Sequence, residues 1–342
     1  MSEKVLYIRA DMNPQISVGH VMRCLSVADS AKARGIKTVF IAADEQPLSL
    51  IKERGHELIV LGSDWQNMDS ELPALEKIIT EKRIESILID TYQVTDAYLR
   101  RVNELTRVYY LDDVNAFPYP VYAVINYSNH ADETTYPVRY PGTKFYLGCG
   151  YAPLREAFKD PHPKKISATI KNVLVMSGGS DPYGMLPQIL EALPLDKYET
   201  VNAICGNYNG DLDSLKAKFA AHPSVHILPR VEKIWRYYEE ADVAISAGGS
   251  TLYELSSMGV PTITYSFVDN QIPNVRAFDL DGVMPYAGDA RGGNVPARVR
   301  KLLKEMDDAS VRSENSRRLQ RLVDGQGADR MVDVLCERPL AN

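Results

Sequence analysis

The stretch Ile16-Ser17-Val18-Gly19-His20-Val21-Met22-Arg23 lies where a predicted strand gives way to a predicted helix. Upstream, residues 5–8 are a short apolar run of strand formers, and downstream apolar residues recur at helical spacing through residue 33. Gly19 lets the backbone turn tightly, and His20 falls in the first helical turn, where free N–H groups and the helix dipole favour anions. The junction therefore predicts a phosphate or nucleotide-sugar site, although a plain loop glycine before an exposed histidine would give the same pattern.

The composition is that of a globular protein without a polyanionic partner. A length of 342 residues exceeds what one hydrophobic core usually supports, so we expect two domains. The net charge of -6 gives no general attraction to nucleic acid or to an anionic membrane, and no apolar run approaches the roughly 20 residues that span a bilayer. We therefore expect a cytoplasmic protein with no nucleic-acid partner and no stable membrane association. The sequence carries no signal for an oligomeric state.

The cysteines are far apart in the sequence and form no C-x-x-C pair. They lie in apolar or glycine-rich settings, which predicts reduced core thiols rather than metal ligands or disulfides. These residues are Cys24, Cys149, Cys205 and Cys336.

Strand-like and helix-like runs alternate along the whole chain. In the first half the strand-like runs are residues 5–8, 38–42, 58–61, 86–89 and 108–111, separated by helix-like runs such as 21–33, 72–82 and 96–105. After a polar, proline-bearing stretch at 159–165, a second series has strand-like runs at 173–176, 201–204, 225–228, 243–246 and 262–265. This repetition predicts two Rossmann-like, doubly wound parallel-sheet domains, residues 1–160 and 161–342, facing each other across a ligand-binding cleft. The closing residues 310–335 are predicted to form a helix interrupted at 325–327.

Two glycine-containing motifs follow predicted strands of the second domain. Gly178-Gly179-Ser180-Asp181 occupies the place there that Gly19-His20 occupies in the first domain, and its backbone amides can close on a phosphate or on the attached sugar. Ser246-Ala247-Gly248-Gly249-Ser250-Thr251 is followed by Glu254. Gly249, Ser250 and Thr251 can hold phosphate oxygens, and the Glu254 carboxylate can accept two hydrogen bonds from a ribose diol. The first motif could instead be a purely structural turn, and the second could instead be a helix capping box.

Polar residues also follow other strands. Asn270 and Gln271, in Asp269-Asn270-Gln271, can orient substrate hydroxyl or amide groups, and an Asx turn explains them equally well. Asp90 and Tyr92 end a first-domain strand and can act as hydrogen-bonding or acid-base groups, or can be structural. The chain has no G-x-x-x-x-G-K-[ST] loop, no G-x-G-x-x-G after the first strand and no H-E-x-x-H or paired-cysteine motif, so we expect no metal site and no cofactor.

Taken in order, these motifs resemble one family: the UDP-2,4-diacetamido-2,4,6-trideoxy-β-L-altropyranose hydrolases of pseudaminic acid biosynthesis, in the MurG-like branch of the GT-B fold. The further stretches that carry the resemblance are Arg9-Ala10-Asp11, Gly19-His20-Val21-Met22-Arg23-Cys24-Leu25, Ile89-Asp90-Thr91-Tyr92, Leu111-Asp112-Asp113, Tyr151-Ala152-Pro153-Leu154-Arg155-Glu156-Ala157-Phe158 and Asp324-Gly325-Gln326-Gly327-Ala328. The second-domain motifs are shared with MurG-like transferases, so the first domain must discriminate hydrolysis from transfer.

The resemblance implies metal-independent hydrolysis of a UDP-sugar with inversion at the anomeric carbon. His20 would be the principal acid-base residue, because an imidazole titrates near neutrality, with Tyr92 and Asn270 beside it at the substrate. The implied substrate-binding residues are Arg9, Asp11, Gly19, Asp90, Gly178, Gly179, Ser180, Asp181, Gly249, Ser250, Thr251, Glu254 and Gln271. Thr91-Tyr92-Gln93 and Met12-Asn13-Pro14 depart from the family pattern, which leaves the sugar open.

Two other functions fit the same motifs. One is a MurG-like glycosyltransferase that moves a sugar from a UDP-sugar to a surface glycan, a spore-coat polysaccharide or a small acceptor. The other is a non-catalytic nucleotide-sugar binding module, which would not need His20.

Overall fold

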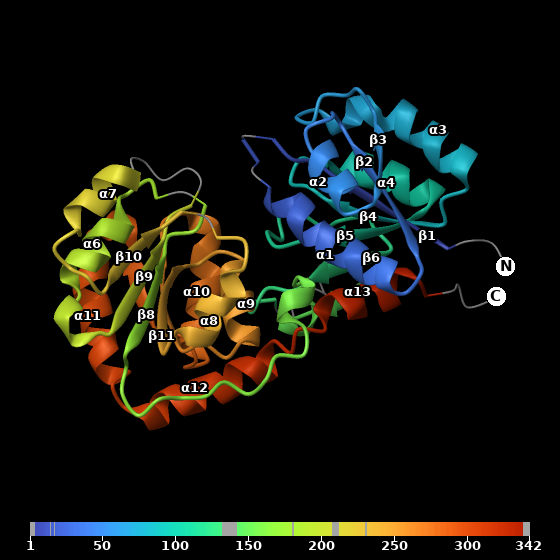
Figure 1. Cartoon of the computed structure of the whole chain (residues 1–342). Coiled ribbons are helices and arrows are strands. Elements are labelled where there is room, and N and C mark those ends of the chain that lie inside the picture. The colour runs from blue at the N-terminus through green and yellow to red at the C-terminus, as the bar shows by residue number, and fades with distance from the viewer. Residues whose placement is uncertain are drawn as a thin grey trace. The chain divides into compact units, whose positions relative to one another are not determined.

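The computed structural model describes residues 4–13, 15–16, 18–131, 142–179, 181–206, 212–229 and 231–337. Contacts divide the chain into two compact units, one comprising Met1–Glu156 with Gly325–Asn342 and the other Ala157–Asp324 (Figure 1). We predicted that the closing residues belong to the second domain. They instead return to the first unit, because the last helix packs there.

Within the described residues, the first unit contains a sheet of seven parallel strands in the order β3-β2-β1-β4-β5-β6-β7. The strands are β1 (Val5–Ala10), β2 (Lys37–Ala42), β3 (Glu57–Val60), β4 (Ser86–Asp90), β5 (Arg107–Leu111), β6 (Ala123–Asn126) and β7 (Lys144–Leu147). Ile8 of β1 is completely buried and lies opposite Phe40 of β2 and Leu88 of β4. The central strands are covered on both faces, which is why they are almost continuously apolar.

Helices cover both faces of this sheet. They are α1 (Gly19–Ala33), α2 (Leu48–Glu53), α3 (Leu72–Lys82), α4 (Asp96–Leu105) and α13 (Gly327–Leu335), with short 3-10 turns η1 (Met68–Glu71) and η2 (Cys149–Tyr151). A further turn, η3 (Glu156–Phe158), lies where the chain passes into the second unit. On one face, Leu75 of α3 and Leu99 of α4 pack into the core formed by β4 and β5. On the other, α13 contacts α1 and β4. The predicted alternation of strands and helices therefore gives a doubly wound unit.

The last helix belongs to the first unit because both of its faces find partners there. Its apolar residues are buried, and its acidic face meets Arg34, which follows α1: Arg34 Nη1 lies 2.5 Å from Asp333 Oδ1 and Nη2 lies 3.3 Å from Asp329 Oδ1. A Cβ on Gly327 would stand 2.1 Å from the carbonyl oxygen of Ala152, so only glycine allows the helix to begin there. The interruption predicted at residues 325–327 is thus the point where the chain crosses back.

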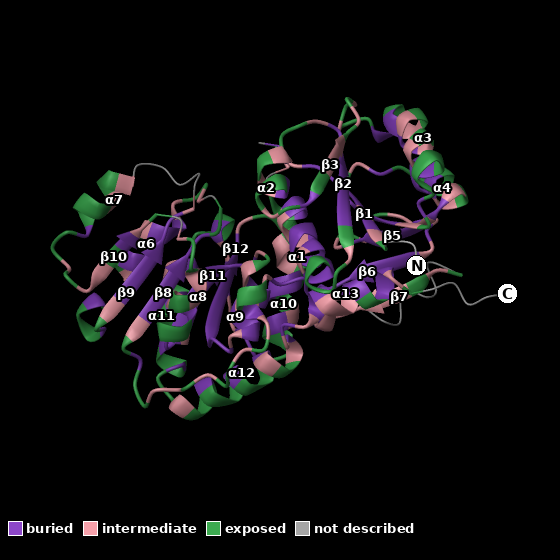
Figure 2. Cartoon of the chain, turned by 45° about the vertical axis from the view of Figure 1, so that its right-hand side comes forward, coloured by how far each residue is buried: buried purple, intermediate pink, exposed green. Residues whose placement is uncertain are grey.

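The second unit contains a sheet whose six described strands are parallel, in the order β10-β9-β8-β11-β12-β13. These are β8 (Asn172–Met176), β9 (Thr200–Ile204), β10 (Val225–Leu228), β11 (Val243–Ala247), β12 (Thr262–Ser266) and β13 (Tyr286–Asp289). Its helices are α6 (Met185–Ala192), α7 (Leu212–Lys218), α8 (Ile234–Glu240), α9 (Thr251–Ser257), α10 (Ile272–Leu280), α11 (Val295–Glu305) and α12 (Ala309–Leu322), with η4 (Leu195–Lys197), η5 (Asp269–Gln271) and η6 (Ala290–Gly292). Figure 2 shows buried residues concentrated in the strands and on the inner sides of the helices.

Both sheets reverse their strand order at one position, and this positions the site. The reversal falls between β1 and β4 in the first sheet and between β8 and β11 in the second. In open α/β sheets the loops at the carboxyl ends of the two strands flanking such a reversal diverge and leave a crevice where ligands bind. The candidate residues after β1 and β4, and after β8 and β11, therefore occupy the expected binding position of their own unit.

The composition led to two further expectations. In the part of the chain that the structure describes, no helix is both long and apolar enough to cross a membrane. The cysteines are free thiols, as predicted: three are buried and Cys336 is half-buried.

Candidate functional site

His20 and Asp90 form a buried pair at the reversal point of the first sheet. His20 is the second residue of α1 and is 7% exposed, whereas Asp90 ends β4 and is fully enclosed. His20 Nδ1 lies 2.6 Å from Asp90 Oδ1. Because an ionised carboxylate only accepts hydrogen bonds, Nδ1 carries the proton and the lone pair remains on Nε2. The imidazole can therefore take a proton at Nε2.

Arg23 fixes the carboxylate of this pair. Its Nε donates to Asp90 Oδ2 at 2.6 Å, and its Nη2 donates to Oδ1 at 2.5 Å. Nη2 also lies 3.1 Å from His20 Nδ1, but two donors do not bond each other, so Oδ1 serves both. Burial alone would raise the pKa of Asp90, and the Arg23 charge with its hydrogen bonds holds that pKa well below its usual range. Asp90 thus acts on His20, and we leave it out of the residues proposed to touch substrate.

Tyr92 lies beside His20, as the predicted site requires. The two rings meet edge to face with centroids 4.6 Å apart, and Tyr92 is 44% exposed. The Tyr92 hydroxyl donates to Asp113 Oδ2 at 3.0 Å, and Arg23 Nη1 donates to the same oxygen at 2.8 Å. Desolvation and the Asp113 carboxylate raise the pKa of Tyr92 well above its usual range, so the phenol keeps its proton at neutral pH.

Two other residues implied by the resemblance, Arg9 and Asp11, are enclosed in the first unit. The Arg9 side chain is 0% exposed and is bound by Glu71, through hydrogen bonds of 2.8 and 2.7 Å. Arg9 therefore holds η1 against β1, and we leave it out of the proposed ligand set. Asp11 Oδ1 accepts from the Ala43 amide at 2.8 Å, while Oδ2 has no hydrogen-bond partner among the described residues. Asp11 therefore remains among the residues proposed to contact the ligand.

In the second unit, the loop after β8 combines a glycine turn with a helix cap. Gly178 has a φ of 82°, a conformation that side chains other than glycine rarely adopt, and both Gly178 and Gly179 are exposed. The Asp181 carboxylate accepts from the amides of Met185 at 2.7 Å and Leu186 at 2.8 Å. Asp181 therefore caps α6 and is not retained as a ligand contact. Ser180, the remaining predicted residue of this motif, lies outside the described residues.

The two glycines after β11 differ in their surroundings. A Cβ on Gly248 would stand 2.4 Å from Val275 Cγ1, so this glycine is needed for packing, whereas Gly249 has no atom within 4 Å of such a Cβ. Ser250 precedes α9 and makes no side-chain capping hydrogen bond, which removes the capping-box alternative. Glu254 is half-buried, and its Oε2 accepts from the hydroxyl of Tyr238 at 3.2 Å. The Gly249 amide donates to the Ala247 carbonyl at 2.9 Å, so the space beside Gly249 and the exposed Ser250 are what a ligand could meet one helical turn before the Glu254 carboxylate.

Asn270 and Gln271 lie in η5, after β12. Asn270 is exposed, and Gln271 Oε1 accepts from the Phe267 amide at 3.1 Å. No side chain caps η5 or α10 through a hydrogen bond, so the Asx-turn alternative is not formed. Asn270 is available to a ligand, and Gln271 is partly committed to its own loop.

The sequence analysis did not assign roles to Arg23, Asp113, Tyr238 or Gly206. The first three are hydrogen-bond partners of assigned residues, and long sequence separations hide such pairs. Gly206 follows β9, and a Cβ there would stand 2.2 Å from the carbonyl oxygen of Gly178. Its position directly after a predicted strand is a signal that could have been used.

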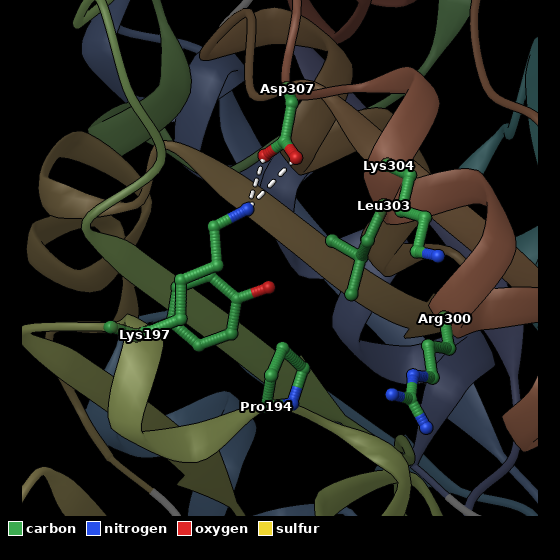
Figure 3. A pocket seen from close by; sticks show the side chains of 7 residues that line it. Pro194, Lys197, Arg300, Leu303, Lys304 and Asp307 are labelled. Atoms are coloured by element: carbon green, nitrogen blue, oxygen red, sulfur yellow. Dashed lines mark hydrogen bonds and ion pairs between the residues drawn. The ribbon is translucent and has the colours of Figure 1, made fainter.

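A cavity of about 360 Å³ in the second unit lies away from these loops (Figure 3). Tyr198, which lines it, precedes β9, and Arg300 and Lys304 come from the second half of α11. Helices that follow parallel strands run back to the amino ends of the strands, so this cavity is at the sheet edge opposite the glycine loops. Lys197 Nζ there is neutralised by both Asp307 oxygens at 2.8 Å.

Comparisons with known proteins agree with this architecture. Residues 172–324 match the glycosyltransferase family 28 C-terminal domain. The spore coat polysaccharide biosynthesis protein SpsG of Bacillus subtilis is 23% identical over 339 residues, which cover 96% of each chain.

Among solved structures, Acinetobacter baumannii MurG has a TM-score of 0.73 at 15% identity, covering 97% of this chain and 99% of its own. The spinosyn rhamnosyltransferase SpnG, solved with thymidine diphosphate, has a TM-score of 0.64 at 12% identity, covering 97% of this chain and 99% of its own. The chain has the MurG-like GT-B fold, as predicted. Together the matches support an enzyme that acts on nucleotide sugars.

Proposed function

We propose that this chain hydrolyses a UDP-linked diacetamido-trideoxy-hexose, UDP-2,4-diacetamido-2,4,6-trideoxy-β-L-altropyranose, to UDP and the free sugar with inversion, as in pseudaminic acid biosynthesis. The observation that carries the proposal is the 2.6 Å contact between His20 Nδ1 and the enclosed Asp90 carboxylate. This pairing orients the ring and leaves Nε2 as a proton acceptor. A positioned base of this kind contributes roughly 10²- to 10⁴-fold to a rate.

In the proposed step, a water molecule gives a proton to His20 Nε2 while its oxygen attacks the anomeric carbon. The bond from that carbon to the phosphate oxygen breaks, and its electron pair leaves with UDP. Asp90 remains ionised, held by Arg23, and stabilises the imidazolium that forms. The Tyr92 hydroxyl, which stays protonated and donates to Asp113, can accept a hydrogen bond at its oxygen from the sugar or from the attacking water.

We assign the nucleotide to the second unit. The loop of Gly249, Ser250 and Thr251 would meet the phosphates, and hydrogen bonds from the protein to the leaving diphosphate stabilise its developing charge. Glu254, oriented by Tyr238, would accept hydrogen bonds from the ribose diol. Gly178 and Gly179 would approach the phosphate or the sugar. This assignment is supported by the match of residues 172–324 to a glycosyltransferase C-terminal domain.

The remaining residues of the proposed site are those at other strand ends. Asn270 would contact the substrate, as the resemblance implies. Asp11, Gly19 and Gln271 would complete the binding surface. No cofactor enters the proposed reaction.

A glycosyltransferase is the second candidate, because residues 172–324 match a glycosyltransferase domain and one relative is named for polysaccharide biosynthesis. His20 could equally deprotonate an acceptor hydroxyl. The two functions separate in one experiment: purified full-length protein is incubated with the diacetamido-trideoxy-altrose nucleotide without acceptor or metal, and UDP release and the sugar anomer are followed by NMR. Release with an inverted free sugar supports hydrolysis. Release only after an acceptor-containing extract is added supports transfer, and no release in either case contradicts both.

A further inference from the structure

Two buried polar atoms near the proposed base have no hydrogen-bond partner among the described residues. One is Asp113 Oδ1, after β5, and the other is His130 Nδ1, after β6. A buried polar atom left unpaired costs roughly 1 to 3 kcal/mol, so an unpaired atom beside a proposed site is a candidate contact for water or for a ligand group. The first unit thus carries two unused positions for a polar ligand group.

These atoms belong to the same edge of the sheet as His20. β5 and β6 are parallel neighbours, and the Asp112 amide donates to the Ile125 carbonyl at 2.9 Å, so the chain beyond β5 starts against β6. Arg23 Nη1 donates both to Asp113 Oδ2 at 2.8 Å and to the Tyr127 hydroxyl at 3.1 Å. Tyr127 lies three residues before His130, and the strand ends therefore gather around Arg23.

The chemistry of the two atoms differs. Asp113 Oδ2 is occupied by Arg23 and Tyr92, which leaves Oδ1 as a pure acceptor that faces no donor of the described chain. Burial lowers the pKa of His130 although the Asp113 and Asp112 carboxylates oppose it, so this imidazole is neutral at neutral pH and has one donor and one acceptor nitrogen. A group that offers both a donor and an acceptor would satisfy the pair.

We propose that Asp113 and His130 form a subsite for a secondary amide substituent of the sugar, with Asp113 Oδ1 accepting its N–H and His130 bonding its other polar atom or a neighbouring hydroxyl. The subsite rests on the proposed function, since it presumes that the first unit holds the sugar. What it adds to the proposed function is the pair of residues that would distinguish an acylamino sugar from a plain hexose.

The test compares binding of UDP-N-acetylglucosamine, UDP-glucose and UDP by calorimetry, in the full chain and in Asp113→Asn. The wild-type protein is expected to prefer the acetamido sugar, and the variant to lose that preference by about 10- to 150-fold, the value of a hydrogen bond to a charged group. UDP affinity should change less than about twofold, because Asp113 contacts no nucleotide in the proposal. A wild-type protein with no preference, or a variant that keeps it, overturns the subsite.

Asp112→Asn is the matched control, since both Asp112 oxygens hold their own loop through the amide of Asn115 and the hydroxyl of Tyr119. It should lower the melting temperature and keep the preference. His130→Asn retains a nitrogen near the Nδ1 position and His130→Leu removes it, so the first should keep more of the preference than the second, even if Asp113→Asn does not fold.

If Asp113 served only to position Arg23 and Tyr92, its substitution would lower kcat and leave the sugar preference unchanged. UDP release from the diacetamido-trideoxy-altrose nucleotide is measured separately on the wild-type protein. A preference for the acetamido sugar without UDP release contradicts the proposed hydrolysis and retains the subsite. UDP release without that preference retains the proposed hydrolysis and contradicts the subsite.

Discussion

Replacing Asp90 by asparagine should destabilise the first unit at neutral pH. Asp90 is fully enclosed and receives four hydrogen bonds: two from Arg23, at 2.6 and 2.5 Å, one from His20 at 2.6 Å and a weaker one from the Cys24 thiol at 3.4 Å. Asparagine has the same shape as aspartate, but it is uncharged, and its NH₂ group would face side chains, Arg23 and His20, that themselves donate hydrogen bonds. Breaking a buried ion pair costs about 3 to 5 kcal/mol. Arg23 keeps its bond to Asp113, so we expect about 3 kcal/mol, the lower end of that range.

The sign of the pH dependence follows from the depressed pKa of Asp90. Its contribution to stability is fully present above the ordinary pKa of an aspartate, about 3.9, and is lost as pH falls through the lower pKa of the folded state. The difference in the free energy of unfolding between the wild-type protein and Asp90→Asn should therefore be constant from pH 7 to about pH 5 and should become smaller below pH 4.

The chain offers a clean assay, because Trp65 lies in the first unit and Trp235 in the second. In a Trp235→Phe background, urea unfolding followed by fluorescence reports on the first unit. With an m value of about 2 kcal/mol per M, the expected loss lowers the midpoint by about 1.5 M. Asp96→Asn is the control, since its pair with Arg100 is exposed and should contribute less than about 0.5 kcal/mol. A midpoint for Asp90→Asn equal to that of the control would refute the reasoning.

Three further predictions concern the proposed site. His20→Asn should abolish most UDP release while UDP affinity, measured by calorimetry, stays nearly intact; retained turnover would exclude the base role. Glu254→Ala should weaken UDP binding by roughly 1.5 to 3 kcal/mol, and unchanged affinity would remove Glu254 from the ribose site. Gly206→Ala should displace Gly178 and Gly179, because its Cβ meets backbone at 2.2 to 2.5 Å. The expected loss of stability is about 1 to 3 kcal/mol with weaker UDP binding, and an unaltered melting temperature and affinity would contradict that contact.

The central strands and helices were predictable because burial on two faces leaves a strong apolar pattern. Residues 72–82 and 96–105 were predicted as helices with the bounds that α3 and α4 have. The strands that the sequence analysis missed, β6, β7 and β13, have four residues each. β7 carries a lysine and β13 is Tyr-Ala-Gly-Asp, so neither has a continuous apolar run. Parallel pairing with a neighbouring strand, which local sequence does not record, stabilises them.

The candidate site was predictable at the level of loops and less so at the level of roles. A glycine or a histidine after a strand is visible in the sequence, and the fold explains why that position binds ligands. Whether a carboxylate faces a ligand or its own protein depends on contacts across long separations. Asp90 and His20 are 70 residues apart, and Arg9 and Glu71 are 62 apart. Asp181 illustrates the local case, since its helix-capping bonds to residues four and five positions ahead compete with any ligand.

The side chains at the two reversal points differ in chemistry. Under the proposed function, the residues of the first unit therefore decide whether water or a sugar acceptor reacts. In the second unit the loops offer exposed glycine backbone and one oriented carboxylate, which suits a nucleotide in either reaction. In the first unit His20, Asp90, Arg23 and Asp113 form one continuous hydrogen-bonded network, with the base only 7% exposed. We expect a nucleophile to reach Nε2 past Tyr92, because the two rings lie edge to face with centroids 4.6 Å apart. Tyr92→Ala would widen this approach. If the size of the opening decides which nucleophile reacts, the variant should transfer the sugar to a bulky acceptor more readily relative to hydrolysis by water. Equal effects on transfer and hydrolysis would instead indicate that the sugar subsite decides.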